Sequence, residues 1–149
     1  MTDEAYMRLA LDEARKALSL GEVPIGAVIV RDGSILAAAH NLRETGKNAL
    51  AHAETRAIDI ACKTLGGWRL PDCTLYVTLE PCMMCAGAIL NARIDRVVYG
   101  APDPTSGALG SKIDARDAGL NHIFDVTGGV LQEECAGILK DFFRGLRQK

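Results

Sequence analysis

The sequence predicts an α/β protein: a three-layer α/β/α sandwich around a five-stranded mixed sheet. Apolar runs of strand length alternate with amphipathic segments of helix length. Only a tight turn separates the first two strand segments, whereas helical crossovers separate the later ones, which indicates an antiparallel hairpin followed by parallel neighbours. The 149 residues, 48% of them hydrophobic, are enough for one domain over residues 1–149 with a buried core.

A helix and a hairpin are expected in the first part of the chain. Apolar residues at three- and four-residue spacing predict a helix over 4–20, which a glycine ends. The apolar runs 27–30 and 35–39 flank Asp32 and Gly33, a pair that suits a tight turn between two strands. The polar loop NLRETGKN follows the hairpin.

Helical and strand patterns alternate in the rest of the chain. Pro81 is predicted at the first position of a helix, where its missing amide proton is not needed, and this helix carries Cys82 and runs to about Ala92. The other predicted elements are a helix over 51–65, strands over 75–79, 96–100 and 122–130, and a final helix over 132–146.

Composition bears on location. The N-terminus has neither the basic start nor the apolar run of a signal peptide, and no stretch approaches the roughly 20 apolar residues of a membrane span. We therefore expect a cytoplasmic protein that does not engage a membrane. The five cysteines cannot all pair, and a reducing compartment makes metal binding or catalysis the better use for some of them.

The charge balance limits the kinds of partner. A net charge of −2 argues against a protein that coats nucleic acid through bulk positive charge. A local basic cluster stands at the C-terminus, and composition alone favours a solvated helix end there, because cations suit the C-terminal end of the helix dipole. The cluster consists of Lys140, Arg144, Arg147 and Lys149.

His52, Cys82 and Cys85 are the ligand types that zinc prefers. The two cysteines are three residues apart at a helix start, so they share one face, and the helix dipole favours their thiolate forms. His52 begins the other helix and joins them if both helix N-termini meet at one edge of the sheet. Three protein ligands leave the fourth tetrahedral position open for water, as in catalytic zinc sites.

Glu54 is the predicted catalytic proton shuttle. It lies two residues after His52, so its side chain points away from the ligand position. Zinc lowers the pKa of its water from about 15.7 toward 7, and a neighbouring carboxylate can take that proton and pass it on. His-Ala-Glu followed by Pro-Cys-x-x-Cys is the signature of zinc-dependent base deaminases.

A structural zinc site is the alternative for a Cys-x-x-Cys pair. It needs a fourth protein ligand, and none of the remaining cysteines and histidines has paired ligand spacing. We interpret the other cysteines as buried small apolar residues and the other histidines as ordinary surface or strand-end residues. These are Cys62, Cys73, Cys135, His40 and His122.

At TLYVTLEPCMMCAGAI, residues 74–89, the chain resembles the bacterial tRNA adenosine deaminases of the cytidine deaminase superfamily. The likeness covers nearly the whole chain and includes EVPIGAVIV, AHAE, ILNARIDRVVYGA, SGALGS and ECAGILKDFFRGLR. Cytosine and guanine deaminases share the metal motif, whereas the flanking blocks favour a tRNA enzyme. The resemblance implies one Zn²⁺ per chain, a homodimer, and conversion of the wobble adenosine of a tRNA anticodon stem-loop to inosine.

The resemblance also implies roles for residues around the base. Asn41 would hydrogen-bond the flipped-out base, with the Ala53 backbone nearby and Val28 against the ring. Asp103, in the loop after the fourth strand, would approach the ribose and phosphate of the target nucleotide.

Outside the base site the resemblance is less complete. Phe143 and Arg144 on the last helix would help to clasp the anticodon loop. The segment before the metal histidine is usually similar to Asp-Pro-Thr-Ala, but residues 48–51 here are Asn-Ala-Leu-Ala, and Leu50 replaces a hydroxyl. The loop after the fourth strand often carries a lysine where Thr105 stands.

Two other functions stay open. The acidic net charge and Thr105 favour a deaminase of free guanine, cytosine or another small aminated heterocycle. A noncatalytic RNA-binding or zinc-stabilised scaffold is the third possibility, and Glu54 argues against it because a pseudoenzyme has no need of a proton shuttle.

Overall fold

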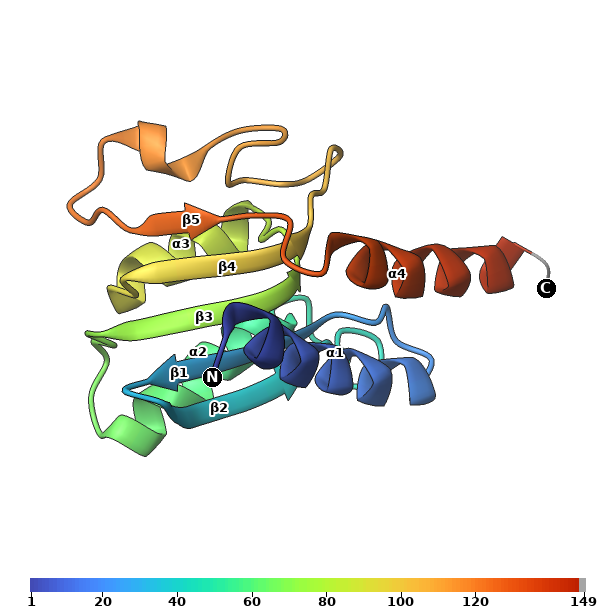
Figure 1. Ribbon diagram of the computed structural model, residues 1–149, viewed down its shortest axis with the longest axis horizontal. Helices are drawn as coiled ribbons and strands as arrows, with labels where there is room; N and C mark the ends of the chain where they lie inside the picture. The colour runs from blue at the N-terminus through green and yellow to red at the C-terminus, as the bar shows by residue number, and fades with distance from the viewer. Residues whose placement is uncertain (148–149) are drawn as a thin grey trace.

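The computed structural model describes residues 1–147, which form a five-stranded sheet with helices on both faces (Figure 1). The predicted α/β/α sandwich around a mixed sheet is confirmed. The strands lie in the order β2-β1-β3-β4-β5. In chain order the elements are α1 Asp3–Ser19, β1 Gly26–Arg31, β2 Ser34–His40, α2 Ala53–Leu65, β3 Cys73–Leu79, α3 Met83–Ala92, β4 Arg96–Ala101, the 3₁₀ helix η1 Ala115–Ala118, β5 Asp125–Thr127 and α4 Gln132–Arg147.

Strand direction determines where the connecting segments meet. β1 pairs antiparallel with both β2 and β3, whereas β3, β4 and β5 are parallel. It follows that β2, β3, β4 and β5 run the same way and only β1 is reversed. The segments that leave β2, β3 and β4 therefore begin at one edge of the sheet.

The hairpin between β1 and β2 has the expected tight turn. Asp32 and Gly33 both have positive φ, 50° and 78°, which is the backbone of a two-residue type I′ turn. Pairing starts directly at Arg31 with Ser34 and continues to Gly26 with His40.

Two apolar clusters hold the layers together. α1 and α4 cover one face of the sheet, whereas α2 and α3 cover the other. Gly26 permits the close approach of α1, because a Cβ atom there would lie 2.0 Å from the Ala10 carbonyl oxygen. Any larger residue would push the helix away from β1.

Three details differ from the sequence prediction. α3 begins at Met83 with Cys82 as its N-cap, so Pro81 precedes the helix instead of occupying its first position, because the extended backbone of Cys82 keeps it out of the helix. α2 likewise begins at Ala53 rather than at residue 51. The last strand spans only Asp125–Thr127, since it pairs with β4 alone and Gly129 then takes φ 87°.

Two further findings concern the basic C-terminal cluster and the possibility of a membrane span. Lys149 of the basic C-terminal cluster lies outside the described residues. Within residues 1–147, no helix combines the length and the apolar character that crossing a membrane requires.

Candidate active site

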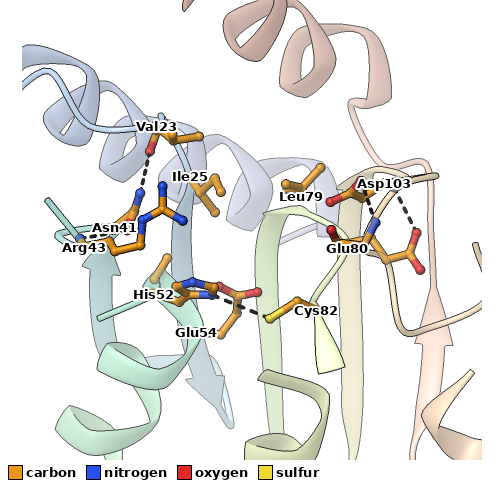
Figure 2. A pocket seen from close by; sticks show the side chains of 12 residues that line it. Val23, Ile25, Asn41, Arg43, His52, Glu54, Leu79, Glu80, Cys82 and Asp103 are labelled. Carbon is orange, nitrogen blue, oxygen red and sulfur yellow. Dashed lines mark hydrogen bonds between the residues drawn. The ribbon is translucent and has the colours of Figure 1, made fainter. Parts of the chain in front are cut away.

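A cavity of about 200 Å³ opens at the edge where β2, β3 and β4 end (Figure 2). Figure 2 shows Asn41 and Arg43 on one side and Glu80 and Asp103 on the other, with His52 and Cys82 between them. The cavity is small compared with binding sites for drug-sized ligands, which have volumes of roughly 300–1,000 Å³. Its lining consists of Val23, Ile25, Asn41, Arg43, His52, Ala53, Glu54, Leu79, Glu80, Cys82, Asp103 and Ser106.

Two helix starts bring the predicted metal ligands together. His52 is the N-cap of α2 and Cys82 is the N-cap of α3, both with extended backbone, and Cys85 lies in the first turn of α3. His52 Nδ1 lies 3.7 Å from Cys82 Sγ and 3.4 Å from Cys85 Sγ. The three ligand atoms all lie within 4.8 Å of one another.

These separations fit a tetrahedral zinc ion. Zinc binds thiolate sulfur at about 2.3 Å and imidazole nitrogen at about 2.0 Å, so a nitrogen and a sulfur ligand lie about 3.5 Å apart across a tetrahedral angle. The two observed distances, 3.7 and 3.4 Å, bracket that value. The two nitrogen–sulfur separations therefore need to change by only a few tenths of an ångström when zinc binds.

The two cysteine thiols differ in how readily they lose a proton. The hydrogen bond with Cys85, together with His52, lowers the pKa of Cys82 to about 4. The same bond and its burial raise the pKa of Cys85. Cys82 is therefore the thiol that ionises more readily. The hydrogen bond with Cys82 also raises the pKa of His52, so a divalent cation that binds here displaces the proton of Cys85 and competes with protonation of His52.

No other residue completes a structural four-ligand site. Within residues 1–147, this triad is the one group of three or more histidine, cysteine or acidic side chains close enough to hold a metal. Cys73 and Cys135 are fully buried, as predicted for small apolar residues, whereas Cys62 is only half-buried. His40 caps the end of β2 and bonds Glu13, and His122 contacts the Ile94 carbonyl.

Glu54 stands beside the triad and lines the cavity. It follows the N-cap of α2 by two residues, and only 4% of its surface is exposed. Burial raises its pKa to about 7. A carboxyl group with such a pKa both accepts and releases protons at neutral pH, which is what a general acid and base requires.

Asn41 is held in a fixed orientation at the cavity wall. Its Nδ2 donates to the Val23 carbonyl at 3.3 Å, and its Oδ1 accepts from the Arg43 amide at 3.0 Å. One amide hydrogen and one lone pair are left for a ligand.

The loop after Asn41 is held by a buried acid, Glu22, which is 1% exposed. The backbone amides of Glu44 and Thr45 donate to the two Glu22 oxygens. Burial by itself raises the pKa of Glu22, but these hydrogen bonds outweigh it and the pKa lies below its ordinary value. Glu22 therefore stays charged and fixes the loop.

The structure places the other predicted residues in three different regions. Ala53 and Asp103 line the cavity, and Asp103 Oδ1 accepts from the Thr105 amide at 3.0 Å. Val28 does not reach the cavity. Side chains along β1 point alternately to the two faces of the sheet, and that of Val28 points to the face beneath α1. Phe143 and Arg144 lie on α4, where they line a separate hollow with Leu139, Lys140 and Arg147.

Sequence reasoning missed several lining residues. Val23 and Ile25 supply apolar wall just before β1, where Val28 was expected, and Arg43 stands at the mouth. Glu80 lies within the motif of residues 74–89, but the motif alone does not indicate its role. An acidic residue directly after an apolar strand was the signal that could have identified it, because such a residue needs buried hydrogen-bond donors.

The three-ligand group, the buried carboxyl group and the base-sized cavity, on this sandwich fold, define the class of metal-assisted deaminases. Residues 1–147 match the family described as MafB19-like deaminase. The chain is 55% identical over 148 residues to the tRNA-specific adenosine deaminase of Bacillus subtilis (strain 168), covering 99% of this chain and 92% of that protein. It therefore belongs to the MafB19-like deaminases, in the group of bacterial tRNA-specific adenosine deaminases.

Solved structures agree with this grouping. One, from a study of A-to-I editing by tRNA:A34 deaminases at the wobble position of transfer RNA, has a TM-score of 0.84 and 47% identity and covers 91% of this chain and 99% of its own. Guanine deaminase from Bacillus subtilis is more distant, with a TM-score of 0.67 and 33% identity over 100% of this chain and 96% of its own.

The Glu22 contacts predict a pH-dependent contribution to stability. Replacing Glu22 with Gln should cost about 1–3 kcal/mol at pH 7, because buried amide donors lose a charged acceptor. The folded pKa lies below the ordinary value of 4.5, so this contribution is present above pH 4.5 and is lost as the pH falls through the folded value.

Thermal unfolding of wild type and Glu22→Gln across the pH range measures this effect. The difference in Tm should be constant near neutrality and shrink in acid. Glu44→Gln is the matched control, because Glu44 lies in the same loop with its side chain 75% exposed, and its Tm should follow wild type throughout. A Glu22→Gln difference that persists undiminished in strong acid would contradict the assignment.

Proposed function

We propose that this protein catalyses the zinc-dependent hydrolytic deamination of the wobble adenosine of tRNA to inosine, acting as one deaminase domain over residues 1–149. The observation that carries the proposal is the buried Glu54 carboxyl beside the His52, Cys82 and Cys85 group in a base-sized cavity. The name of the Bacillus subtilis relative and the work on tRNA:A34 deaminases support adenosine in tRNA as the substrate.

The triad would hold one zinc ion per chain. When bound, zinc lowers the pKa of a coordinated water from about 15.7 toward 7, which supplies a nucleophile at neutral pH. Two thiolates balance the charge of the ion. The thiolates require reducing conditions, which together with a tRNA substrate supports a cytoplasmic location.

Glu54 moves the protons of the reaction. Its carboxylate takes the proton of the attacking water and delivers it to N1 of adenine as the C6–O bond forms. It then takes the proton of the new C6 hydroxyl group and transfers it to the amine, and the C6–N bond breaks to release ammonia as the C6 carbonyl forms. The pKa of about 7 allows the same group to act in both directions.

The cavity walls orient the base. Asn41 offers its remaining amide hydrogen and lone pair to the polar edge of the ring, and the Ala53 backbone lies beside it. Ile25 and Leu79 provide the apolar contact that was expected from Val28. Asp103, on the opposite wall from Asn41, is positioned to approach the ribose and phosphate of the nucleotide.

Glu54→Gln tests the proton shuttle. The variant keeps the shape of the side chain but cannot accept a proton, so kcat for inosine formation should fall by about 10²–10⁴. Zinc content by atomic emission should stay at one per chain, because Glu54 is not a ligand. His52→Ala is the complementary variant, which should lose both the metal and the activity. Full activity in Glu54→Gln would exclude the proposed mechanism.

The C-terminal helix supplies the proposed contact with the anticodon loop. α4 packs on β4 and then extends beyond the edge of the sheet, which Figure 1 shows at the right. Phe143 is 43% exposed there, available for stacking on an unpaired base, and Arg144 stands next to it. Leu50 and Thr105 are exposed as well, so the two departures from the family pattern change the surface of the protein and not the metal ligands.

Charge reversal tests the role of α4. Arg144→Glu combined with Arg147→Glu should raise the KM for an anticodon stem-loop, and should flatten the dependence of log(kcat/KM) on log salt by about 1.4, which corresponds to two phosphate contacts. Lys63→Glu, at the far end of α2 from the active site, is the control with unchanged kinetics. Unchanged kinetics and an unchanged salt slope in the double variant would remove α4 from the RNA site.

An apolar groove supports the proposed homodimer. Met83 and Leu120 expose 67% and 59% of their surfaces on the outer side of α3 and η1. Such a groove is suited to a second copy of the chain, since apolar surface of this kind gains free energy when it is covered. Its lining consists of Met83, Gly87, Leu90, Ile113, Asp114, Ala115, Asp117, Ala118 and Leu120.

The solution mass tests the dimer. Light scattering should give twice the chain mass of 15.9 kDa for wild type and the chain mass for Leu120→Glu. Leu18→Glu changes an exposed leucine on the opposite face and should remain dimeric. A wild-type mass of one chain would contradict the proposal.

Deamination of a free base is the second candidate. The small cavity and the structural likeness to guanine deaminase favour it. Ammonia release from free guanine, cytosine or adenine, with no inosine formed in the stem-loop, would establish this activity in place of the first. A noncatalytic scaffold is disfavoured because it would not need Glu54 buried beside the triad.

A further inference from the structure

Glu80 is a buried acid that receives four hydrogen bonds from a single loop. It is 2% exposed and connects β3 to the Pro-Cys segment. The Asp103 amide donates to its Oε1 at 3.1 Å, and the Leu109 and Ser111 amides donate to its Oε2 at 2.9 and 3.1 Å. The Ser111 hydroxyl also donates to Oε1. Glu80 thus accepts hydrogen bonds from both ends of the loop 103–111.

Only a carboxylate meets this arrangement. All the backbone partners are N–H donors, and they approach both oxygens, so both oxygens must be acceptors. Bonds of this kind to a charged acceptor are stronger than bonds between neutral groups.

Packing as well as hydrogen bonding ties the loop to Glu80. A Cβ atom at Gly107 would lie 2.4 Å from Glu80 Cδ and 2.5 Å from the Asp103 carbonyl oxygen. The loop backbone therefore lies directly against the carboxylate.

The same loop forms one wall of the active-site cavity. It presents Asp103 on the side opposite Asn41 (Figure 2), and its Ser106 also lines the cavity. Asp103 Oδ1 accepts from the Ser106 amide at 3.2 Å, which makes the first turn of the loop a rigid unit. Glu80 also lines the cavity, two residues before Cys82, so one side chain links the metal-ligand segment to the wall that faces the nucleotide.

We propose that Glu80 is a positioning residue that holds the loop 103–111 where Asp103 and Ser106 can contact the ribose and phosphate of the bound nucleotide. It therefore controls binding of the RNA and leaves the proton transfers to Glu54. The proposal rests on the proposed function, which makes the nucleotide the ligand of this wall.

Glu80→Gln is the direct test. The amide group places two hydrogens against backbone N–H donors on one side of the side chain, so part of the loop should detach. The KM for an anticodon stem-loop should rise at least about tenfold, the effect of a lost interaction of roughly 1.4 kcal/mol, whereas kcat should change much less. Zinc content should stay at that of wild type. A loss of kcat with an unchanged KM would overturn the proposal.

Hydrogen exchange gives a readout that does not depend on activity. The amides of 103–111 should exchange faster in Glu80→Gln than in wild type. Glu22→Gln is the matched control, a buried acid that accepts from the backbone of a different loop, so its faster exchange should fall on residues 43–46 instead. Unchanged exchange at 103–111 would show that Glu80 does not hold the loop.

A double-mutant cycle with Asp103→Ala separates positioning from a general effect on the fold. If Glu80 acts through the placement of Asp103, the decreases in log(kcat/KM) of the two single variants should add up to more than the decrease measured for the double variant. Fully additive decreases would show that Glu80 does not act through Asp103. Ser111→Ala removes one of the four hydrogen bonds, and it gives the same tests in milder form if Glu80→Gln does not fold.

The outcomes also separate this inference from the proposed function. If wild type makes no inosine in the stem-loop but exchange at 103–111 still depends on Glu80, the proposed function fails while the structural role of Glu80 stands. If wild type deaminates the stem-loop and Glu80→Gln keeps the wild-type KM, the positioning role fails and the proposed function stands.

Discussion

The common direction of β2, β3 and β4 is the constraint on which the active site depends. Each of these strands ends at the same edge of the sheet, and each delivers a different part of the site there. The segment after β2 supplies Asn41 and leads to His52, the segment after β3 supplies Glu80 and the cysteines, and the segment after β4 supplies Asp103. If one of these strands were reversed, its contribution would lie on the far side of the molecule.

Glu22, Glu54 and Glu80, three of the buried glutamates, perform different tasks because their surroundings differ. Glu22 accepts two backbone amides and Glu80 accepts three, and these bonds lower their pKa despite burial. For Glu54 burial dominates, so its pKa rises to about 7. Two acids are thereby fixed as charged anchors for loops, and the third is left able to exchange a proton. Glu22 and Glu80 thus hold the loops that form the cavity walls, and Glu54 lies between these walls.

The parts of this structure that depend on local sequence were predictable. Periodicity and turn residues predicted the four α-helices and the five strands but not the 3₁₀ helix η1, and the residue types and spacing of His52, Cys82 and Cys85 predicted the metal group. The predicted starts of α2 and α3 were off by two residues, because His52 and Cys82 serve as N-caps and an N-cap carries no periodicity signal.

The parts that depend on long-range contacts were not predictable. The position of Val28 follows from which face of β1 meets α1, and sequence alone does not show this for a strand that is buried on both faces. The partners of Glu80 lie 23 to 31 residues along the chain, so its role is visible only once the loop 103–111 has folded back.

The size of the cavity explains how a protein of net charge −2 can act on RNA. About 200 Å³ admits one base and excludes its neighbours, so the base has to leave its stack, which costs least in a single-stranded loop. Recognition of the rest of the RNA must then occur outside the cavity. Screening limits the reach of each surface charge to about 8 Å at physiological salt. In the proposed complex, the cations that α4 carries past the sheet edge would therefore act on nearby phosphates more strongly than the acidic groups spread over the rest of the surface.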